Sequence, residues 1–431
     1  MPDETLDLFG RNRWLRFGLS TNPYFVEALS SADEGPRPIS LFQGRSEQGR
    51  QLASTIASEE SSLCLVEAPS GVGKSTFVNY VKHRLRERYF APPVEVGVQS
   101  NWTAQHVVLG AVDAIVRHAS DVHPQKKWSE REFPAISRAR ELVMTVQRAG
   151  WSPNLGISLF GAGPSIGVSP TVSTQPPLLG PVLSPAFLEE VVREARTLSL
   201  PPTEGVILHV NNLDTLLASS PRSARTLISD LRDFFGVSGT HWVLVGPPGL
   251  RSNAIAPERR VLTFVKETVE LDKLPLGDVE KLLEKRYRHY KTRPKWTEPT
   301  APELISKLYR EFGGDLRGML NALSVSHRFY DPVDIRPMPH EFGLGTLSAF
   351  YRRRLEASLA PKTHAVLAHL VDLRRDEFTQ DDAASIERHQ SNRSRRFAEL
   401  EQEDAVRLLR SEGPRKIYTL GGASGLAFHG R

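Results

Sequence analysis

The sequence contains one cysteine, Cys64, among 431 residues, so a disulfide within the chain is excluded. It also lacks any uninterrupted run of about 18 apolar residues, the length that a membrane-spanning helix requires. The first residues, Met1 to Glu4, carry acidic charge and no apolar core, so we expect no secretion signal. These absences predict a cytoplasmic protein without a membrane partner or a Cys/His metal cluster, in which Cys64 is a small buried apolar residue.

The composition is that of a globular chain, with 39% hydrophobic and 24% charged residues. Its length predicts about two to four domains. The formal net charge is +5 and the isoelectric point is near 9.2, which permits contact with nucleic acid without requiring it.

A phosphate-binding motif runs from Ala68 to Thr76, between an apolar strand-like run at 63–66 and a helix-like segment at 77–88. The glycines let the backbone N–H groups turn toward phosphate oxygens, and the helix N-terminus adds partial positive charge. The lysine suits the β- and γ-phosphates, and the serine hydroxyl suits Mg²⁺. We therefore predict ATP and Mg²⁺ as cofactors, with Mg²⁺ at Ser75 and nucleotide contacts from Pro69, Ser70, Gly71, Val72, Gly73, Lys74, Ser75 and Thr76.

Buried strand patterns alternate with helical patterns through the first two thirds of the chain. Strands are predicted at 94–98, 206–210, 241–246 and 261–271, and helices at 102–118, 185–198 and 223–235. This alternation predicts a parallel α/β sheet with helices on both faces. The Gly, Pro and Ser-rich stretch 150–184 fits a β-hairpin insertion or an extended loop.

After Leu271 the predicted strands stop, and three helices follow at 276–290, 301–312 and 315–330. We predict an N-terminal extension at 1–40, a P-loop base domain at 41–271, a helical lid at 272–330, a linker at 331–345 and a winged-helix domain at 346–431. In the last domain, Thr379 and Asp382 fit a capping box, and Ser391 is expected to cap a helix running to Glu401. A two-stranded wing is expected to follow.

Several motifs in order resemble the AAA+ ATPases, in the branch of origin-recognition initiators and transposon target-selection ATPases. They are Phe42-Gln43-Gly44-Arg45, the P-loop, the strand from Val206 toward Asp214, the Leu274-Pro275-Leu276 element and Gly314-Asp315-Leu316-Arg317, within residues 22–330. The resemblance implies that Arg317 senses the γ-phosphate from the lid, and that Arg260 or Arg259 serves a neighbouring subunit as an arginine finger. It also implies that Pro23, Phe42 and Gln43 border the adenine, and that the chain forms a homo- or hetero-oligomer.

The sequence departs from this family after the strand 206–210. Asn211 and Asn212 stand where two carboxylates are expected, and an amide has neither the charge nor the basicity to replace them. Either hydrolysis is slow, or Asp214 or another nearby carboxylate takes the role. Gly246 likewise stands where a polar sensor residue is usual, and His209 fits a hydrogen-bonded core histidine.

The helix at 391–401 resembles the recognition helix of winged-helix regulators. It is expected to bury Phe397 and Leu400 and to expose its basic residues toward duplex DNA. The predicted DNA-binding residues are Asn392, Arg393, Arg395, Arg396, Arg407, Arg415 and Lys416. Nearby acidic residues keep open a winged helix that binds protein instead.

The leading hypothesis is thus an ATP-controlled protein that binds duplex DNA and hydrolyses ATP slowly. One alternative is an active DNA-remodelling ATPase. The other is a scaffold ATPase whose winged helix binds a protein partner. A co-encoded effector protein is a further expected partner, and replication, transposition and mobile-element defence all fit these features.

Overall fold

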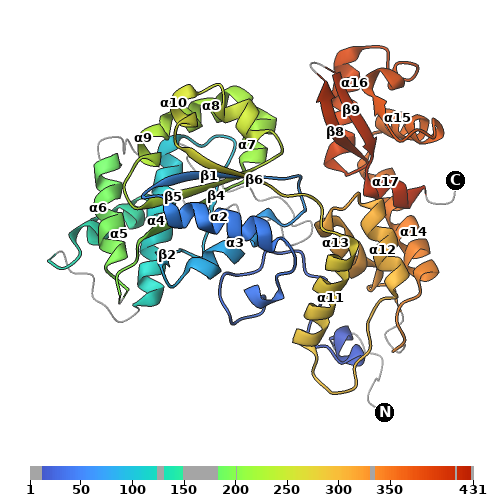
Figure 1. The fold of residues 1–431 in the computed structure, drawn as a ribbon. Helices are drawn as coiled ribbons and strands as arrows, with labels where there is room; N and C mark the ends of the chain where they lie inside the picture. Colours follow the sequence, from blue (N-terminus) through green and yellow to red (C-terminus); the bar gives the residue numbers. More distant parts are fainter. Residues whose placement is uncertain are drawn as a thin grey trace. The chain divides into compact units, whose positions relative to one another are not determined.

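The computed structural model describes residues 12–123, 131–148, 183–199, 201–330, 335–412 and 415–428. The chain divides into two compact units, one of Glu27–Asp272 and the other of Met1–Val26 together with Lys273–Arg431 (Figure 1). The insertion predicted at 150–184 lies outside the described residues, apart from Leu183 and Ser184.

The first unit contains a six-stranded sheet in the order β2-β4-β5-β1-β6, with β3 also paired to β4. Every described pairing in this sheet is parallel. The predicted parallel α/β fold is therefore confirmed. The strands are β1 (Ser62–Glu67), β2 (Tyr89–Phe90), β3 (Val96–Gly97), β4 (Gly205–Asn211), β5 (Thr240–Gly246) and β6 (Val265–Glu270).

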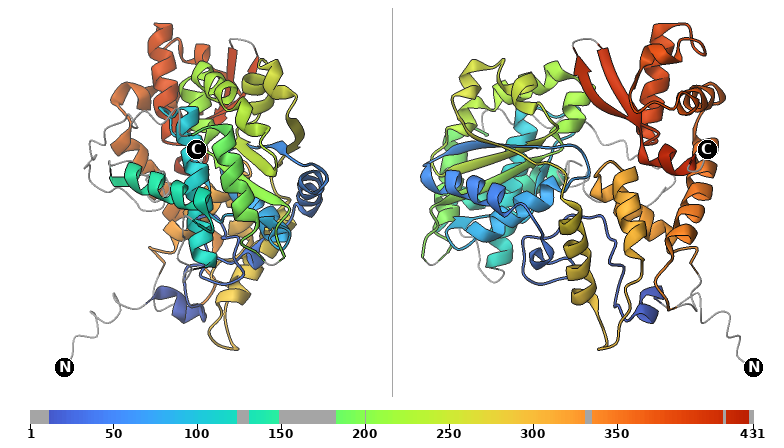
Figure 2. Two further views of the ribbon diagram at one scale, coloured as in Figure 1. Left: turned by 90° about the vertical axis from the view of Figure 1, so that its left-hand side faces the viewer. Right: turned by 45° about the vertical axis from the view of Figure 1, so that its right-hand side comes forward.

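Helices cover both faces of the sheet (Figures 1 and 2). Successive side chains of a strand point to opposite faces, so Leu63 and Leu65 join one hydrophobic cluster while Cys64 and Val66 join another. The first cluster includes residues of α4 (Ala104–Val122), α5 (Pro134–Arg148), α6 (Pro185–Arg196) and α8 (Pro221–Asp230). The second includes residues of α2 (Ser46–Ser58) and α3 (Lys74–Leu85). Cys64 is fully buried, as predicted, and burial raises the pKa of its thiol to about 12.

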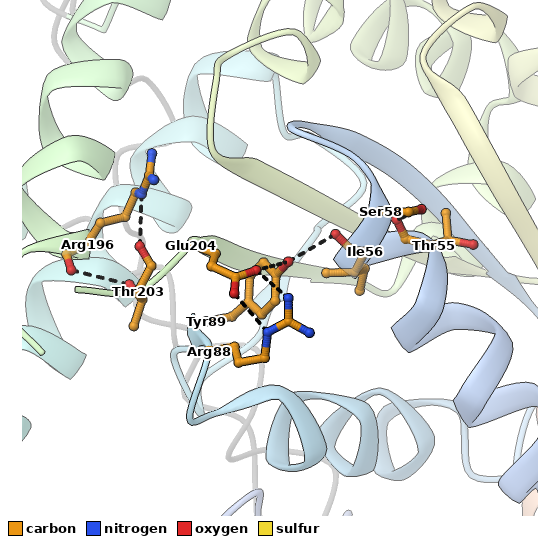
Figure 3. Close-up of polar contacts among 8 residues, drawn as sticks. All are labelled: Thr55, Ile56, Ser58, Arg88, Tyr89, Arg196, Thr203 and Glu204. Atoms are coloured by element: carbon orange, nitrogen blue, oxygen red, sulfur yellow. Dashed lines mark hydrogen bonds and ion pairs between the residues drawn. The ribbon is translucent and has the colours of Figure 1, made fainter. Parts of the chain in front are cut away.

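A polar cluster fixes the amino end of β4 to its neighbours (Figure 3). Arg88 donates two hydrogen bonds to the Glu204 carboxylate at 2.8 and 2.7 Å, and the Tyr89 hydroxyl donates to the same carboxylate at 3.1 Å. On the other side, Arg196 Nε donates to the Thr203 carbonyl at 3.1 Å. These contacts join the short strand β2 and helix α6 to the start of β4, the strand that carries Asn211.

Short helices connect the later strands of the base. They are α7 (Leu213–Ser219), α9 (Arg232–Phe235), the π-helical turn η3 (Arg251–Ile255) and α10 (Arg259–Leu262).

The second unit begins with helices α11 (Leu276–Tyr290), α12 (Pro302–Glu311), α13 (Leu316–Ser326) and α14 (His340–Ser358). The first of these has the predicted bounds, and α14 begins inside the stretch predicted as a linker. Residues 12–26 pack against these helices. Tyr24 is fully buried there, with its hydroxyl 2.8 Å from that of Tyr287 and its ring stacked on His327.

The C-terminal part combines helices with a three-stranded antiparallel sheet in the order β7-β9-β8, an arrangement compatible with a winged helix. Its elements are α15 (Pro361–Asp372), β7 (Phe378–Thr379), η4 (Gln380–Ala383), α16 (Gln390–Gln402), β8 (Val406–Glu412), β9 (Arg415–Leu420) and α17 (Gly422–Ala427). The capping box of Thr379 and Asp382 is confirmed. The prediction that Ser391 caps α16 is wrong, because the helix begins at Gln390 and its N-cap is His389, two residues earlier than predicted.

Candidate functional site: a phosphate loop at the edge of the sheet

The phosphate loop joins the end of β1 to the start of α3. Gly71 and Gly73 adopt positive φ angles of 79° and 96°, a conformation that costs other residues strain. Gly73 is also the N-cap of α3, and it provides no capping side chain to the N–H groups at that end of the helix. The first turn of the helix therefore offers its N–H groups and partial positive charge to an anion.

Lys74 directly follows the glycine turn as the first residue of α3, which begins three residues before the predicted segment 77–88. Its ammonium donates to the carbonyls of Ala68 and Pro69 at 2.8 and 3.2 Å. The carboxylate of Asp214, in the first turn of α7, lies 3.7 Å from the same ammonium. Asp214, the carboxylate expected as an alternative to Asn211 and Asn212, therefore lies next to the phosphate loop, beside its lysine.

Asn211 reaches the other functional side chain of the loop. Its amide nitrogen donates to the Ser75 hydroxyl at 2.7 Å. Asn212, by contrast, has a positive φ of 66° and forms the N-cap of α7. Asparagine is among the few non-glycine residues that tolerate this conformation, which gives Asn212 a conformational reason to be an amide.

A carboxylate that the sequence pattern did not single out completes this cluster. Glu95, which directly precedes β3, accepts a hydrogen bond of 2.9 Å from the same amide nitrogen of Asn211. The only sequence signal was an isolated acidic residue inside the predicted strand 94–98. Serine, amide and carboxylate are therefore linked, although they come from three separate segments.

Buried polar side chains lie behind this cluster. Lys82 on α3 is 1% exposed, and burial lowers its pKa to about 8 against the opposing attraction of Glu95. His209 is buried as expected, but the expectation that its nitrogens are hydrogen-bonded is wrong for the described part of the chain. Burial, together with the charge of Lys82, holds the pKa of His209 well below its ordinary value, so its ring is neutral.

Arg45 holds the phosphate loop in place by hydrogen bonds to backbone carbonyls, a role that its sequence motif did not predict. Its guanidinium donates to the carbonyl of Val72 at 2.8 Å and to that of Asp272 at 2.7 Å. Its φ of 59° is left-handed, so the bracing contacts hold a strained backbone. Phe42 stacks on Tyr80 at 4.2 Å between ring centres, and Gln43 is half-buried between Phe42 and Gly44.

The position after β5 has no room for the polar sensor residue that is usual there. A Cβ atom added at Gly246 would lie 2.9 Å from a methyl carbon of Leu250. The nearby polar group is instead Glu67, whose carboxylate accepts hydrogen bonds from the backbone N–H groups of Gly249 and Arg251 at 2.9 and 2.5 Å. Glu67 thereby connects the strand before the phosphate loop to the turn after β5.

The predicted arginines of the nucleotide site lie on different units. Arg259 and Arg260 are exposed on α10 of the base. Arg317 is the second residue of α13 in the other unit, directly after a turn in which Asp315 caps the helix by accepting from the Gly318 N–H at 3.0 Å. The sensor and arginine-finger roles stay predictions.

Two arginines predicted to be exposed on α16 are held within their own domain. Arg396 is 9% exposed and donates to Thr363 and to both oxygens of Glu399, each at 3.2 Å. Arg393 pairs with Asp381 at 2.9 Å and donates to the carbonyls of Glu387 and Arg388. The predicted exposure of both side chains is wrong, because α16 uses them to fix the preceding turn and α15.

Arg407 is also not a free wing residue. Its guanidinium binds the Asp404 carboxylate at 2.7 and 3.0 Å, donates to the Phe312 carbonyl and lies 3.7 Å from Asp315. It therefore attaches β8 to the helical part of the same unit. Asn392 is half-buried and donates to Glu387 at 3.2 Å. The exposed basic residues of the predicted set are Arg395, Arg415 and Lys416.

The fold and the motif together describe a parallel α/β domain in which strand β1 leads through a glycine-rich loop of the phosphate-binding pattern into helix α3. No family model matches the chain, and no curated protein matches it either. No described helix is long and apolar enough to cross a membrane.

Several solved structures are similar to the chain over most of its length, at low sequence identity. The Aeropyrum pernix ORC1 protein in complex with DNA is 14% identical with a TM-score of 0.47, covering 97% of this chain and 96% of that one. The Walker-type ATPase PABY2304 of Pyrococcus abyssi is 12% identical with a TM-score of 0.48, covering 94% and 99%. Drosophila ORC bound to DNA is 12% identical with a TM-score of 0.40, covering 97% and 91%.

Proposed function

We propose that this protein is an ATP-controlled DNA-binding switch in which nucleotide binding, more than rapid hydrolysis, changes the affinity for duplex DNA. The observation that carries the nucleotide half is the phosphate loop, where Gly73 opens the N-terminus of α3 and Lys74 and Ser75 follow at once. Backbone N–H groups, an ammonium and a hydroxyl at one helix end suit a nucleoside triphosphate with Mg²⁺.

Slow hydrolysis follows from the chemistry at the end of β4. Asn211 donates to Ser75 and Glu95, so its amide is committed to holding the cluster together. Asn212 caps α7, and neither amide has the basicity to accept a proton from an attacking water. The proposal expects steady-state turnover far below the ~10 s⁻¹ that is typical of enzymes. Turnover at that rate, abolished by Lys74→Ala, would instead support an active remodelling ATPase that uses Asp214.

The DNA half of the proposal rests on the C-terminal part of the second unit. Arg395 on α16 and Arg415 and Lys416 on β9 are exposed, and Arg395 lies 3.9 Å from Glu399, the one ion pair described for it. Arginine and lysine side chains in such positions neutralise DNA phosphates and release counterions. Arg393 and Arg396 are paired with carboxylates of their own domain, which lowers the positive charge available for DNA phosphates. This observation favours the alternative of a protein-binding winged helix.

The test is fluorescence anisotropy of a labelled random duplex titrated with the full chain, in the presence of ATP, of ADP and of neither. We expect ATP with Mg²⁺ to change the DNA affinity by about 5-fold or more, the lower range of allosteric coupling, and Lys74→Ala to remove the change. The matched control is Lys266→Ala, an exposed lysine on β6 of the same sheet that pairs with Glu59 at 3.1 Å. Absence of salt-dependent DNA binding would overturn the DNA half and favour a protein partner.

A further inference from the structure

The oxygen donors beside the phosphate loop suit magnesium. Mg²⁺ prefers oxygen ligands and is commonly held by one or two carboxylates together with the phosphates of a substrate. Ser75 provides a hydroxyl and Glu95 a carboxylate. The amide nitrogen of Asn211 donates a hydrogen bond to each of them, at 2.7 Å to the hydroxyl and at 2.9 Å to the carboxylate. The residues present therefore fit the ion, even though the end of β4 carries no carboxylate.

We propose that Glu95 supplies the carboxylate that Asn211 and Asn212 lack and holds Mg²⁺ beside Ser75. This inference rests on the proposed function, since it concerns the ion that accompanies bound ATP. In this assignment the metal-binding carboxylate does not come from the end of β4. It comes from Glu95, directly before β3, and Asn211 at the end of β4 is the amide that orients it.

The pairing of the two strands explains why Glu95 reaches this point. Val96 lies opposite Val210 and Gly97 lies opposite Asn211 in a parallel ladder. Because side chains alternate along a strand, Glu95, His209 and Asn211 face the same side of the sheet, which is the side of α3. Gly97 leaves the space around the second asparagine open, since a Cβ atom there would lie 3.3 Å from the Asn212 amide nitrogen.

The surroundings of Glu95 favour a carboxylate that stays in place. One oxygen accepts from Asn211, and the other lies 3.7 Å from Nδ1 of His209. Lys82, buried on α3, attracts the carboxylate electrostatically and has no hydrogen-bond partner in the described part of the chain. The Glu95 side chain is 21% exposed, so it is not sealed from solvent.

Asp214 is the competing candidate, and its position separates the two roles. It lies 3.7 Å from the Lys74 ammonium and is bonded to the backbone N–H of Thr215 at 3.1 Å. No hydrogen bond or ion pair is described between Asp214 and either Ser75 or Asn211. Asp214 is therefore on the lysine side of the loop, whereas Glu95 is on the serine side, where the ion is expected.

The test measures metal affinity directly, not turnover. Mn²⁺ replaces Mg²⁺ as the probe, and its binding to the complex of the full chain with ADP is followed by electron paramagnetic resonance. Glu95→Gln is expected to weaken Mn²⁺ binding by about 10- to 100-fold, the range seen when a group supporting a metal site is removed. The affinity for MANT-ADP (a fluorescent nucleotide) in EDTA is expected to stay within about 2-fold of the parent, because the residues that bind the phosphates are unchanged.

The matched control is Glu204→Gln, which removes a carboxylate from the opposite end of β4 and is expected to leave Mn²⁺ affinity unchanged. The double variant Glu95→Gln with Asn211→Asp exchanges the amide and the carboxylate, and it is expected to recover most of the metal affinity. It also covers the case in which Glu95→Gln alone unfolds, since it keeps a counter-charge for Lys82.

Unchanged Mn²⁺ affinity in Glu95→Gln, or a loss seen in Asp214→Asn instead, would overturn the assignment while leaving the proposed function intact. A parent protein that binds no MANT-ATP with or without Mg²⁺ would overturn the proposed function and this inference with it.

Discussion

The phosphate-loop edge of the base sheet and helix α16 both bring polar side chains together, but they arrange them differently. At the sheet edge, Ser75, Asn211 and Glu95 from three separate segments converge beside a helix N-terminus. On α16, Arg393 and Arg396 turn back onto carboxylates and carbonyls of their own domain. The sheet edge therefore presents polar groups to a ligand, whereas α16 uses most of its arginines to fix its own fold.

Acid sensitivity is the largest expected difference between the two units. Burial holds the pKa of His118 and of His241 at about 4 and that of His209 well below its ordinary value in the base. In the second unit, burial holds the pKa of His327 at about 3. The unfolded chain binds protons near pH 6.5, so stability falls as the pH drops below that value.

Each histidine with a folded pKa near 4 is expected to cost about 2 kcal/mol of unfolding free energy at pH 5 relative to pH 7. Urea unfolding of the full chain, followed by tryptophan fluorescence, measures this difference. His241→Gln is expected to reduce the pH dependence, since it removes one such group. Equal unfolding free energies at pH 7 and pH 5 would contradict the burial of neutral histidines in the base.

Removing the loop lysine should give the next largest effect. Lys74→Ala is expected to weaken MANT-ATP binding by about 100-fold, because charge-assisted hydrogen bonds to phosphate contribute about 1.5–3 kcal/mol. Lys266→Ala, on β6, is the control that should retain the parent affinity. Equal affinities of the two variants would place the nucleotide elsewhere.

The inward arginines of α16 should affect folding more than DNA binding. Arg396→Ala is expected to lower the unfolding free energy of the second unit by about 1–3 kcal/mol, because it removes the buried guanidinium that donates to Thr363 and to both oxygens of Glu399. Arg395→Ala, one residue earlier and exposed, should change stability by less than about 0.5 kcal/mol. A thermal denaturation series of both variants decides between a structural and a surface role for each arginine.

Replacing the exposed basic residues should give the smallest effect, which is a weaker dependence of the DNA affinity on salt concentration. Replacing Arg395, Arg415 and Lys416 by alanine is expected to reduce the slope of log affinity against log salt by about 0.9 for each DNA phosphate that the variant no longer neutralises. Anisotropy titrations from 50 to 200 mM salt (about a fourfold range) measure the slope. An unaltered slope would remove these residues from the DNA surface.

The contrast between the two regions also explains which parts of the site could be predicted from the sequence. The glycine turn at Gly71 and Gly73 between a strand and a helix was predicted correctly, because it depends on local backbone geometry, which the spacing determines; the helix itself begins at Lys74, three residues before the predicted segment 77–88. Glu95 was missed because its place depends on the pairing of β3 with β4, an interaction between residues more than a hundred positions apart in the chain.

Helix α16 shows the same limit of sequence-based prediction, because the environment of its arginines depends on contacts with other segments. Phe397 and Leu400 are buried as their spacing indicates. The arginines that precede them could extend into solvent or fold back onto a carboxylate of the same domain, and periodicity does not distinguish these arrangements. The partners placed by the fold, among them Glu399 for Arg396 and Asp381 for Arg393, hold the two arginines against their own domain.

The central claim is that the nucleotide site and the DNA-binding surface are coupled, and binding coupling is reciprocal. The most direct test measures the affinity of the full chain for MANT-ATP with Mg²⁺, with and without saturating duplex DNA. The account predicts that DNA changes the nucleotide affinity by the same factor by which ATP changes the DNA affinity. Identical nucleotide affinities in the presence and absence of bound DNA would contradict it.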